Sequence, residues 1–305
     1  MNGGPAFGRA LAAAAVLAVG GCAWTPAVLD PKGPVGLAER DLLFAATGLM
    51  LIVVIPVFVM AFWFAWHFRA SNTNARYTPH WNYSGPIDAI VWLVPALIVV
   101  AIGYLVWNST HRLDPYRPIA ATTPPLHVDV VAEDWRWLFL YPEQNIAVVN
   151  ELVFPSGRPL SLRLTSDTVM NSFYIPGLGG QIFAMAGMQT RLNLLADGPA
   201  TFVGRNMQYS GRGFPDQSFA VHAVGDADFR SWIAQAKQAP GRLDAAAYAA
   251  LAKPTAKSPV IVYSAYEPGL FERIIDRYMG PAGRPRRQLA RRQLATTALP
   301  QAGGR

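Results

Sequence analysis

Two long apolar stretches constrain this 305-residue chain more than any other feature of its sequence. Residues 42–68 contain no charged side chain unless His67 is protonated, and residues 89–107 contain none. About 20 apolar residues are enough to cross a bilayer as a helix, so the sequence predicts transmembrane helices at 42–68 and 87–107. Each contains a proline, Pro56 or Pro95, which a membrane helix tolerates where a neighbouring helix supports the freed carbonyl. We expect a two-helix hairpin whose kinks face a partner protein.

The N-terminal residues have the pattern of a bacterial secretion signal. Arg9 precedes an apolar run that ends in the small residues Leu17-Ala-Val-Gly-Gly-Cys22, which is typical of a lipoprotein signal. The sequence therefore predicts a signal peptide at 1–21 and lipidation of Cys22; an ordinary buried cysteine near a cleaved signal is the alternative. Cys22 is the only cysteine, so the mature chain has no disulfide and no cysteine-bridged metal site.

The distribution of charge predicts the orientation in the membrane. The loop at 69–86 carries Arg69 and Arg76 and no acid, whereas the segment at 22–41 carries acids as well as bases. Positively charged loops stay in the cytoplasm, so we expect the loop to be cytoplasmic and the residues after 107 to be periplasmic. The chain would then be a multi-pass protein of the bacterial inner membrane, with a lipid anchor at the periplasmic face.

The net charge of +7 comes mainly from the C-terminal tail, residues 281–305. This tail contains no acid and several arginines: Arg284, Arg286, Arg287, Arg291, Arg292 and Arg305. Its composition predicts a disordered, solvated segment, with contact to anionic membrane lipids as the alternative. A periplasmic arginine run does not indicate nucleic acid, so no such partner is expected.

Between the hairpin and the tail, the pattern predicts a β-rich domain at 108–225 and a helical extension at 226–280. Apolar residues alternate with a period of two, which is typical of the strands of a sandwich or barrel. The candidate strands are 126–130, 135–141, 160–164, 173–175, 181–184, 190–195, 200–204 and 219–224. In the extension, Phe229 and Phe271 begin two amphipathic helical sets, with Asp226 as the expected cap of the first.

This layout, together with four local motifs, resembles subunit II of the haem-copper respiratory oxidases, in the ubiquinol-oxidising branch of the cytochrome bo type. The motifs are Leu29-Asp-Pro-Lys-Gly33, Trp135-Arg-Trp137, 164–176 and 184–191, and the resemblance runs from Cys22 to Met279. It implies a cupredoxin-like β-sandwich after the hairpin. It also implies a proton-pumping complex in which subunit I binds ubiquinol, the haems and one copper, alongside smaller membrane subunits.

The resemblance also bears on a dinuclear copper site, which members of the family that oxidise cytochrome c hold in this domain. That site uses two thiolates, two imidazoles, a thioether and a backbone carbonyl. The matching positions here are Asn171, Asn206, Gln208, Ser210, Phe214 and Gln217. None supplies a soft side-chain ligand, since amide and hydroxyl oxygens are hard and phenylalanine has no lone pair. The resemblance therefore implies a copper-free domain with no cofactor in this chain.

Other candidate metal ligands are few. The histidines His67, His80, His111, His127 and His222 show no pair at ligand spacing, so no metal site is expected. Met170, Met185, Met188 and Met207 raise the alternative of cuprous chemistry, but methionine in a strand-rich core more often fills gaps between other side chains. Trp135 and Trp137 match aromatic residues that carry electrons from copper in relatives; without copper, we expect them to pack in the domain.

Asp88 is the one residue to which the resemblance gives an active role. It is the only carboxylate between Arg69 and the end of the second predicted span. One interpretation is an acid that stabilises a helix N-terminus through the helix dipole. The other comes from the family, in which an acid at this place opens a proton pathway into the catalytic subunit.

The predicted function is a non-catalytic subunit of a quinol:oxygen oxidoreductase that reduces oxygen to water. This chain would contain no active site; it would anchor and cap subunit I. A membrane-tethered periplasmic scaffold or assembly lipoprotein is the alternative, although two proline-containing spans exceed what a tether needs beside a lipid anchor.

Overall fold

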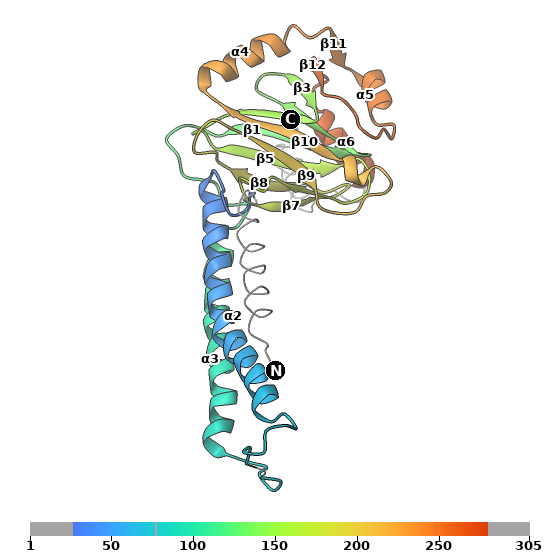
Figure 1. Cartoon of the computed structure of the whole chain (residues 1–305). Coiled ribbons are helices and arrows are strands. Elements are labelled where there is room, and N and C mark those ends of the chain that lie inside the picture. Colours follow the sequence, from blue (N-terminus) through green and yellow to red (C-terminus); the bar gives the residue numbers. More distant parts are fainter. Residues whose placement is uncertain (1–26, 77, 280–305) are drawn as a thin grey trace, which may run out of the picture. The chain divides into compact units, whose positions relative to one another are not determined.

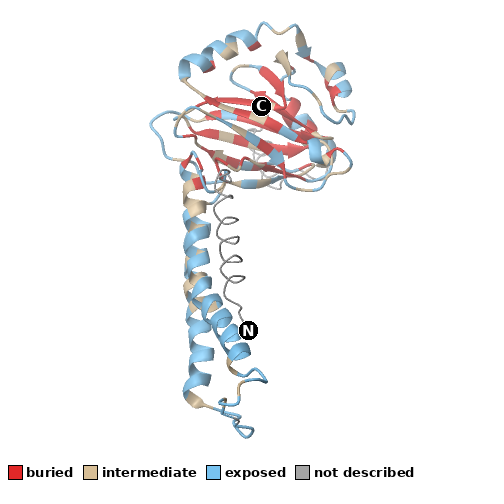
Figure 2. Cartoon of the chain, in the orientation of Figure 1, coloured by how far each residue is buried: buried red, intermediate tan, exposed pale blue. Residues whose placement is uncertain are grey.

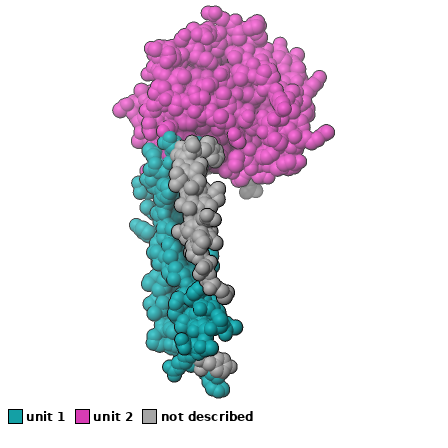
Figure 3. Space-filling model, in the orientation of Figure 1, with its two compact units in different colours: residues 1–30, 35–114 teal, residues 31–34, 115–305 magenta. Residues whose placement is uncertain are grey.

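The computed structural model describes residues 27–76 and 78–279, which divide into two compact units (Figures 1 and 3). Of the described residues, 27–30, 35–76 and 78–114 form one unit, and 31–34 and 115–279 form the other. The predicted signal peptide, Cys22 and the arginine-rich tail at 281–305 lie outside the described residues.

The first unit consists of two long helices, α2 (Pro34–His67) and α3 (Gly85–Arg112). Their 34 and 28 residues correspond to about 50 and about 42 Å, so both exceed a hydrocarbon core of about 30 Å. Both helices begin before the predicted spans, at Pro34 and Gly85, and α3 continues past residue 107 to Arg112. Polar residues beyond the hydrocarbon region continue each helix, and proline fits the first turn of a helix because it needs no backbone donor there.

The side chains of these helices are mostly exposed in the isolated chain (Figure 2). Gly36 is the only buried residue of α2, and α3 buries none of its residues. Both helices are long and apolar enough to cross a membrane. Their exposed apolar surface therefore suits lipid or another membrane protein.

The second unit is a two-sheet sandwich followed by a mixed extension. Seven strands form one sheet, in the order β11-β12-β3-β2-β1-β5-β8, and five form the other, in the order β4-β10-β9-β6-β7. The strands are β1 (Leu126–Glu133), β2 (Arg136–Tyr141), β3 (Ile146–Val149), β4 (Glu151–Pro155), β5 (Leu160–Ser166), β6 (Asn171–Tyr174), β7 (Gln181–Ala184), β8 (Thr190–Leu194), β9 (Ala200–Asn206), β10 (Ser218–Val224), β11 (Gly241–Leu243) and β12 (Ile261–Tyr266). The predicted cupredoxin-like sandwich is thus present, and β3 and β4 are additional strands.

A cluster of aromatic rings fills the space between the two sheets. The Trp137 ring meets the edge of Phe173, with centroids 5.2 Å apart, and Phe173 stacks on Phe219 at 5.1 Å. Trp137 and Phe173 are fully buried, and Phe219 is nearly so. Burying large aromatic side chains is among the strongest contributions to folding, so this cluster fixes how the sheets face each other.

The extension differs from the predicted helical segment. Besides α4 (Asp226–Ala236), α5 (Ala245–Leu251) and α6 (Leu270–Met279), it contributes β11 and β12, and β12 pairs antiparallel with β3. The prediction named the two helices that are present as α4 and α6, but it missed α5, β11 and β12. It was also wrong about Asp226, which is the first residue of α4, because the cap residue is Gly225 and makes no side-chain cap bond.

Within the extension, α5 and α6 cover the outer face of the seven-stranded sheet, β11 and β12 join that sheet, and α4 packs against the first core (Figure 1). Val131, Leu138 and Leu140 on this face join a second core with residues of the extension: Leu243, Tyr248, Leu251, Tyr266, Leu270, Phe271 and Ile274. The central strand β2 is consequently buried on both faces, and all six of its residues are buried.

Candidate functional site

The residues at the predicted copper-ligand positions meet at one end of the five-stranded sheet. Asn171 begins β6 and Asn206 ends β9, and these two strands pair with Phe173 opposite Asn206. Ser210 lies in the loop after β9, and Gln217 immediately precedes β10. The sheet therefore brings together residues that are far apart in the sequence.

Four of these side chains form one hydrogen-bonded cluster, which we call the amide cluster: Asn171, Asn206, Ser210 and Gln217. Asn206 Nδ2 donates to Asn171 Oδ1 at 2.7 Å, to Gln217 Oε1 at 2.8 Å and to Ser210 Oγ at 3.2 Å. Ser210 Oγ donates to Gln217 Oε1 at 2.9 Å. Gln217 Nε2 donates to Asn171 Oδ1 at 3.1 Å. These bonds close a ring between two strands and the loop that joins β9 to β10.

The amide cluster is buried and also holds the main chain. Asn171, Asn206 and Gln217 are exposed by 0%, 4% and 2%. Asn206 Oδ1 accepts from the Ser172 and Gln208 backbone amides at 2.8 and 3.0 Å. Buried polar groups stabilise a fold when their partners are complete, and those of Asn206 are.

The chemistry of the amide cluster does not suit copper. Its oxygens are hard ligands, whereas a charge-sharing copper pair needs thiolates, imidazoles and a thioether. Among residues 27–76 and 78–279, no group of three or more histidines, cysteines and acids could hold a metal ion.

The other two predicted positions take different roles. Gln208 joins the amide cluster only through its backbone N–H. Phe214 begins a short 3-10 helix (Phe214–Asp216), and its ring lies 5.8 Å from that of Tyr209. Phe214 also lines a surface pocket of about 330 Å³ together with Asn206 and Gln217.

Trp135 also contacts the loop between β9 and β10. It lies in the two-residue turn between β1 and β2 with a φ of 66°, so its predicted place inside a strand was wrong. Its Nε1 donates to the Ser210 carbonyl at 3.1 Å. The indole also lies so close to Gly213 that a Cβ there would be 2.2 Å from Trp135 Cδ2. Trp135 and Trp137 thus make packing contacts, as the sequence favoured.

Three of the four methionines do not behave as predicted, whereas Met185 is half-buried. Met170, Met188 and Met207 are exposed by 40%, 49% and 52%, so they do not fill gaps in the core. They lie in loops between strands, where a side chain has no opposing sheet to pack against.

Asp88 lies in the first turn of α3 and is exposed. Its backbone N–H donates to the Ser84 carbonyl at 2.9 Å, which begins the helical hydrogen bonding. A carboxylate here interacts favourably with the positive end of the helix dipole and is exposed at the surface of the isolated chain. The geometry is compatible with both interpretations of this residue.

Sequence reasoning missed the groups that support the amide cluster. Ser166 Oγ accepts from Asn171 Nδ2 at 3.4 Å and donates to the Val169 carbonyl at 2.7 Å. The Glu133 backbone carbonyl accepts from Gln217 Nε2 at 3.4 Å. Neither residue carries a sequence signal for this role, because both contacts depend on how the sheets meet.

Two helices that are long and apolar enough to cross a membrane, followed by a cupredoxin-like sandwich, define a class of protein: subunit II of the haem-copper oxidases. Residues 237–282 match the family model described as the COX Aromatic Rich Motif. The chain is 52% identical over 284 residues to cytochrome bo(3) ubiquinol oxidase subunit 2 of Pseudomonas putida, covering 92% of this chain and 90% of that one. It is 47% identical to ubiquinol oxidase subunit 2 of Acetobacter aceti, over 82% of each chain.

Among solved structures, the periplasmic domain of subunit II of cytochrome oxidase from Bradyrhizobium japonicum is similar with a TM-score of 0.37 and 21% identity, over 39% of this chain and 98% of that one. The identities to the sequence relatives extend over nearly the whole chain. This chain belongs to the ubiquinol oxidase subunit 2 family.

Proposed function

We propose that this chain is the copper-free subunit 2 of a ubiquinol oxidase complex in the bacterial inner membrane. The observation that carries the proposal is 52% identity over 92% of the chain to a named ubiquinol oxidase subunit 2. In such a complex, subunit I binds ubiquinol, the haems and one copper, reduces oxygen to water and pumps protons. The amide cluster supports a chain without a redox centre, because its side chains bond to one another.

The chain's contribution is then mechanical. Helices α2 and α3, with Pro56 and Pro95 inside them, pack on subunit I and the smaller membrane subunits and contact membrane lipids; their exposed apolar surface supports this role. The sandwich forms a rigid periplasmic cap. Diacylation of Cys22 adds a lipid anchor at the same face. Nucleic acid has no part in this function.

Asp88 collects protons on the cytoplasmic side for the catalytic subunit. Its exposure at the start of α3 supports this role, because a solvated carboxylate exchanges protons readily. The variant Asp88→Asn keeps the shape of the side chain and removes its proton exchange, so oxygen turnover of the complex should slow. Asp41→Asn, which alters an exposed acid in α2, is the matched control and should leave turnover unchanged. Equal turnover in Asp88→Asn and wild type would exclude the proton role.

Oxygen uptake tests the function as a whole. The complex is captured through this chain in mild detergent, and a reduced ubiquinone analogue and reduced cytochrome c are supplied in separate assays. We expect uptake with the quinol alone. Uptake with cytochrome c would reveal an electron acceptor in this chain and contradict the copper-free assignment. Absence of uptake with both donors, together with absence of haem in the captured material, would indicate a scaffold or assembly lipoprotein instead.

A further inference from the structure

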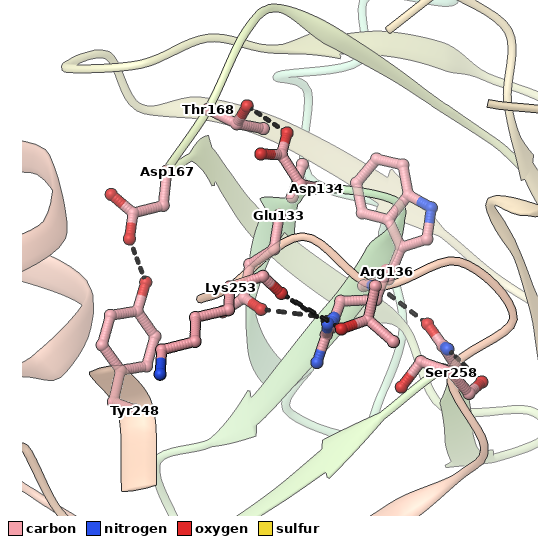
Figure 4. Close-up of polar contacts among 12 residues, drawn as sticks. Glu133, Asp134, Arg136, Asp167, Thr168, Tyr248, Lys253 and Ser258 are labelled. Atoms are coloured by element: carbon pink, nitrogen blue, oxygen red, sulfur yellow. Dashed lines mark hydrogen bonds and ion pairs between the residues drawn. The ribbon is translucent and has the colours of Figure 1, made fainter. Parts of the chain in front are cut away.

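Glu133 is a buried acid that the proposed function does not use. It ends β1 on the outer face of the seven-stranded sheet, under the extension, two residues after Val131 of the second core (Figure 4). Its exposed fraction is 2%, and neither carboxyl oxygen has a hydrogen-bond partner among the described residues. A fully buried carboxyl without partners is rare, because its charged form loses its hydration without compensation.

The nearest cation, Arg136, is held by another group. Arg136 Nε lies 3.9 Å from Glu133 Oε2, which is too long for a hydrogen bond. Arg136 Nη2 instead donates to the Lys253 carbonyl at 2.8 Å, in the segment between α5 and β12 (Figure 4). The guanidinium therefore binds the extension to the sandwich and keeps only a long ion pair, without a hydrogen bond, to Glu133.

The other groups facing Glu133 do not favour its negative charge. Asp134 bonds to Thr168, and Asp167 accepts from Tyr248 and from Arg277, which balances its charge. Two phenols, of Tyr248 in α5 and Tyr263 in β12, complete the surroundings. The Lys253 side chain is exposed. Arg136 is thus the one cation that favours the ionised form of Glu133, and the charges of Asp134 and Asp167 oppose its effect on the pKa.

Asp129 provides a comparison on the same strand and the same face of the sheet. It is also buried, with 3% exposed, but Arg163 binds both of its oxygens, at 2.6 and 2.5 Å. Asp129 therefore has an ion pair in which both oxygens accept hydrogen bonds, whereas Glu133 has no hydrogen bond from its nearest cation. Burial raises the pKa of Glu133 to about 8, and the Arg136 charge offsets only part of that rise.

We propose that Glu133 is a proton-binding site that controls how firmly the C-terminal extension is held on the sandwich. With its proton bound, the carboxyl is neutral and Arg136 stays on the Lys253 carbonyl. When the segment at 245–258 lifts away, Glu133 meets water and releases one proton to the solvent. Loss of the proton in the closed form leaves a buried carboxylate that competes for Arg136. This role is independent of the proposed oxidase function.

The sign of the pH response follows from this linkage. In the open form the pKa of Glu133 returns to its ordinary value of 4.5, whereas in the closed form it is about 8. Between these values the closed form carries one proton more, so opening becomes about tenfold more favourable for each unit of rising pH. Above the closed-form pKa the response levels off, because both forms are then ionised.

Hydrogen exchange of the full chain in detergent micelles tests the proposal. The backbone amides of 245–258 are followed from pH 5 to pH 9 in wild type and in Glu133→Gln, which is permanently neutral and of similar shape. The ratio of the two variants cancels the chemical pH dependence of exchange. We expect the ratio of wild type to Glu133→Gln to rise by about tenfold per pH unit and to flatten near pH 8. Asp129→Asn, the matched control, should keep the wild-type response. A constant ratio would overturn the proposal.

Infrared spectroscopy provides a second readout, which does not depend on how Glu133→Gln folds. A protonated carboxylic acid has a carbonyl stretch that carboxylates lack. In wild type we expect one such band to persist at neutral pH and to vanish near pH 8. The same band should be present at neutral pH in Asp129→Asn. Disappearance of all carboxylic acid bands below pH 6 would refute proton binding by Glu133, whatever the behaviour of Glu133→Gln.

Discussion

Replacing Asn206 by alanine tests whether the amide cluster holds the loop between β9 and β10. The change removes Asn206 Oδ1, which accepts from the backbone amides of Ser172 and Gln208. It also removes Asn206 Nδ2, which donates to Asn171 and Gln217. An unsatisfied buried amide costs about 1–3 kcal/mol, and each other hydrogen bond contributes about 1 kcal/mol. We expect Asn206→Ala to lower the free energy of unfolding by about 3 kcal/mol.

The assay is thermal melting of the full chain in detergent, followed by tryptophan emission at one heating rate. Trp135 reports directly on the loop, because its indole N–H donates to the Ser210 carbonyl. For a folded unit of about 150–250 residues, each kcal/mol lowers the Tm by roughly 2–4 °C. Asn206→Ala should therefore melt roughly 6–12 °C below wild type.

Asn193→Ala is the matched control for the loss of an amide side chain. Asn193 Nδ2 makes one partly buried hydrogen bond, to the Pro115 carbonyl at 3.0 Å, so its loss should cost about 1 kcal/mol. A double variant with Asn171→Ala adds a second test, because neighbours in one network give non-additive effects. Equal losses in Asn206→Ala and Asn193→Ala, or full additivity of Asn206→Ala and Asn171→Ala, would refute a cooperative amide cluster.

Three further predictions use the same melting assay or hydrogen exchange. Gly213→Ala should lower the Tm and shift tryptophan emission to the red, because its Cβ would overlap the Trp135 indole, whereas Gly198→Ala meets nothing within 4 Å and should melt like wild type. Tyr141→Phe removes a buried hydroxyl that donates to and accepts from the β4 backbone at 2.9 Å, and should cost about 1–3 kcal/mol in the melting assay. Arg277→Gln removes the half-exposed guanidinium that binds Asp167, whose side chain is 2% exposed, so the loss should be about 1–3 kcal/mol and appear also as faster amide exchange in α6.

The sequence predicted the two membrane helices because the absence of charge over a whole span is independent of tertiary context. It could not predict where the helices end, since continuation from Gly85 or to Arg112 depends on local capping rather than on hydrophobicity. The strands were predictable where one face meets the core. The alternation is lost in β2, where the extension buries the second face and all six residues become buried.

The candidate site was predictable only in part, for a different reason. Family resemblance located the six copper-ligand positions, and the chemistry of their side chains argued against copper. Nothing in the sequence indicated that Asn171, Asn206, Ser210 and Gln217 would bond to one another, because the contacts arise from strand pairing across long separations. The sequence also could not predict that the Glu133 carboxyl lacks a hydrogen bond, because this depends on Arg136 donating to the Lys253 carbonyl instead.

The amide cluster suggests why a sandwich without a metal can keep the loop that a metal would organise. A metal ion joins several ligands because each donates electrons to one centre; without it, side chains that only accept would repel one another. Asparagine and glutamine solve this problem because each carries donors and an acceptor. Asn206 donates to three partners and accepts from two backbone amides, so one neutral side chain ties β6, the loop and the start of β10 together. Because Asn206 Oδ1 already accepts two backbone amides, hydrogen bonds of this side chain, together with the packing of Trp135, hold the loop.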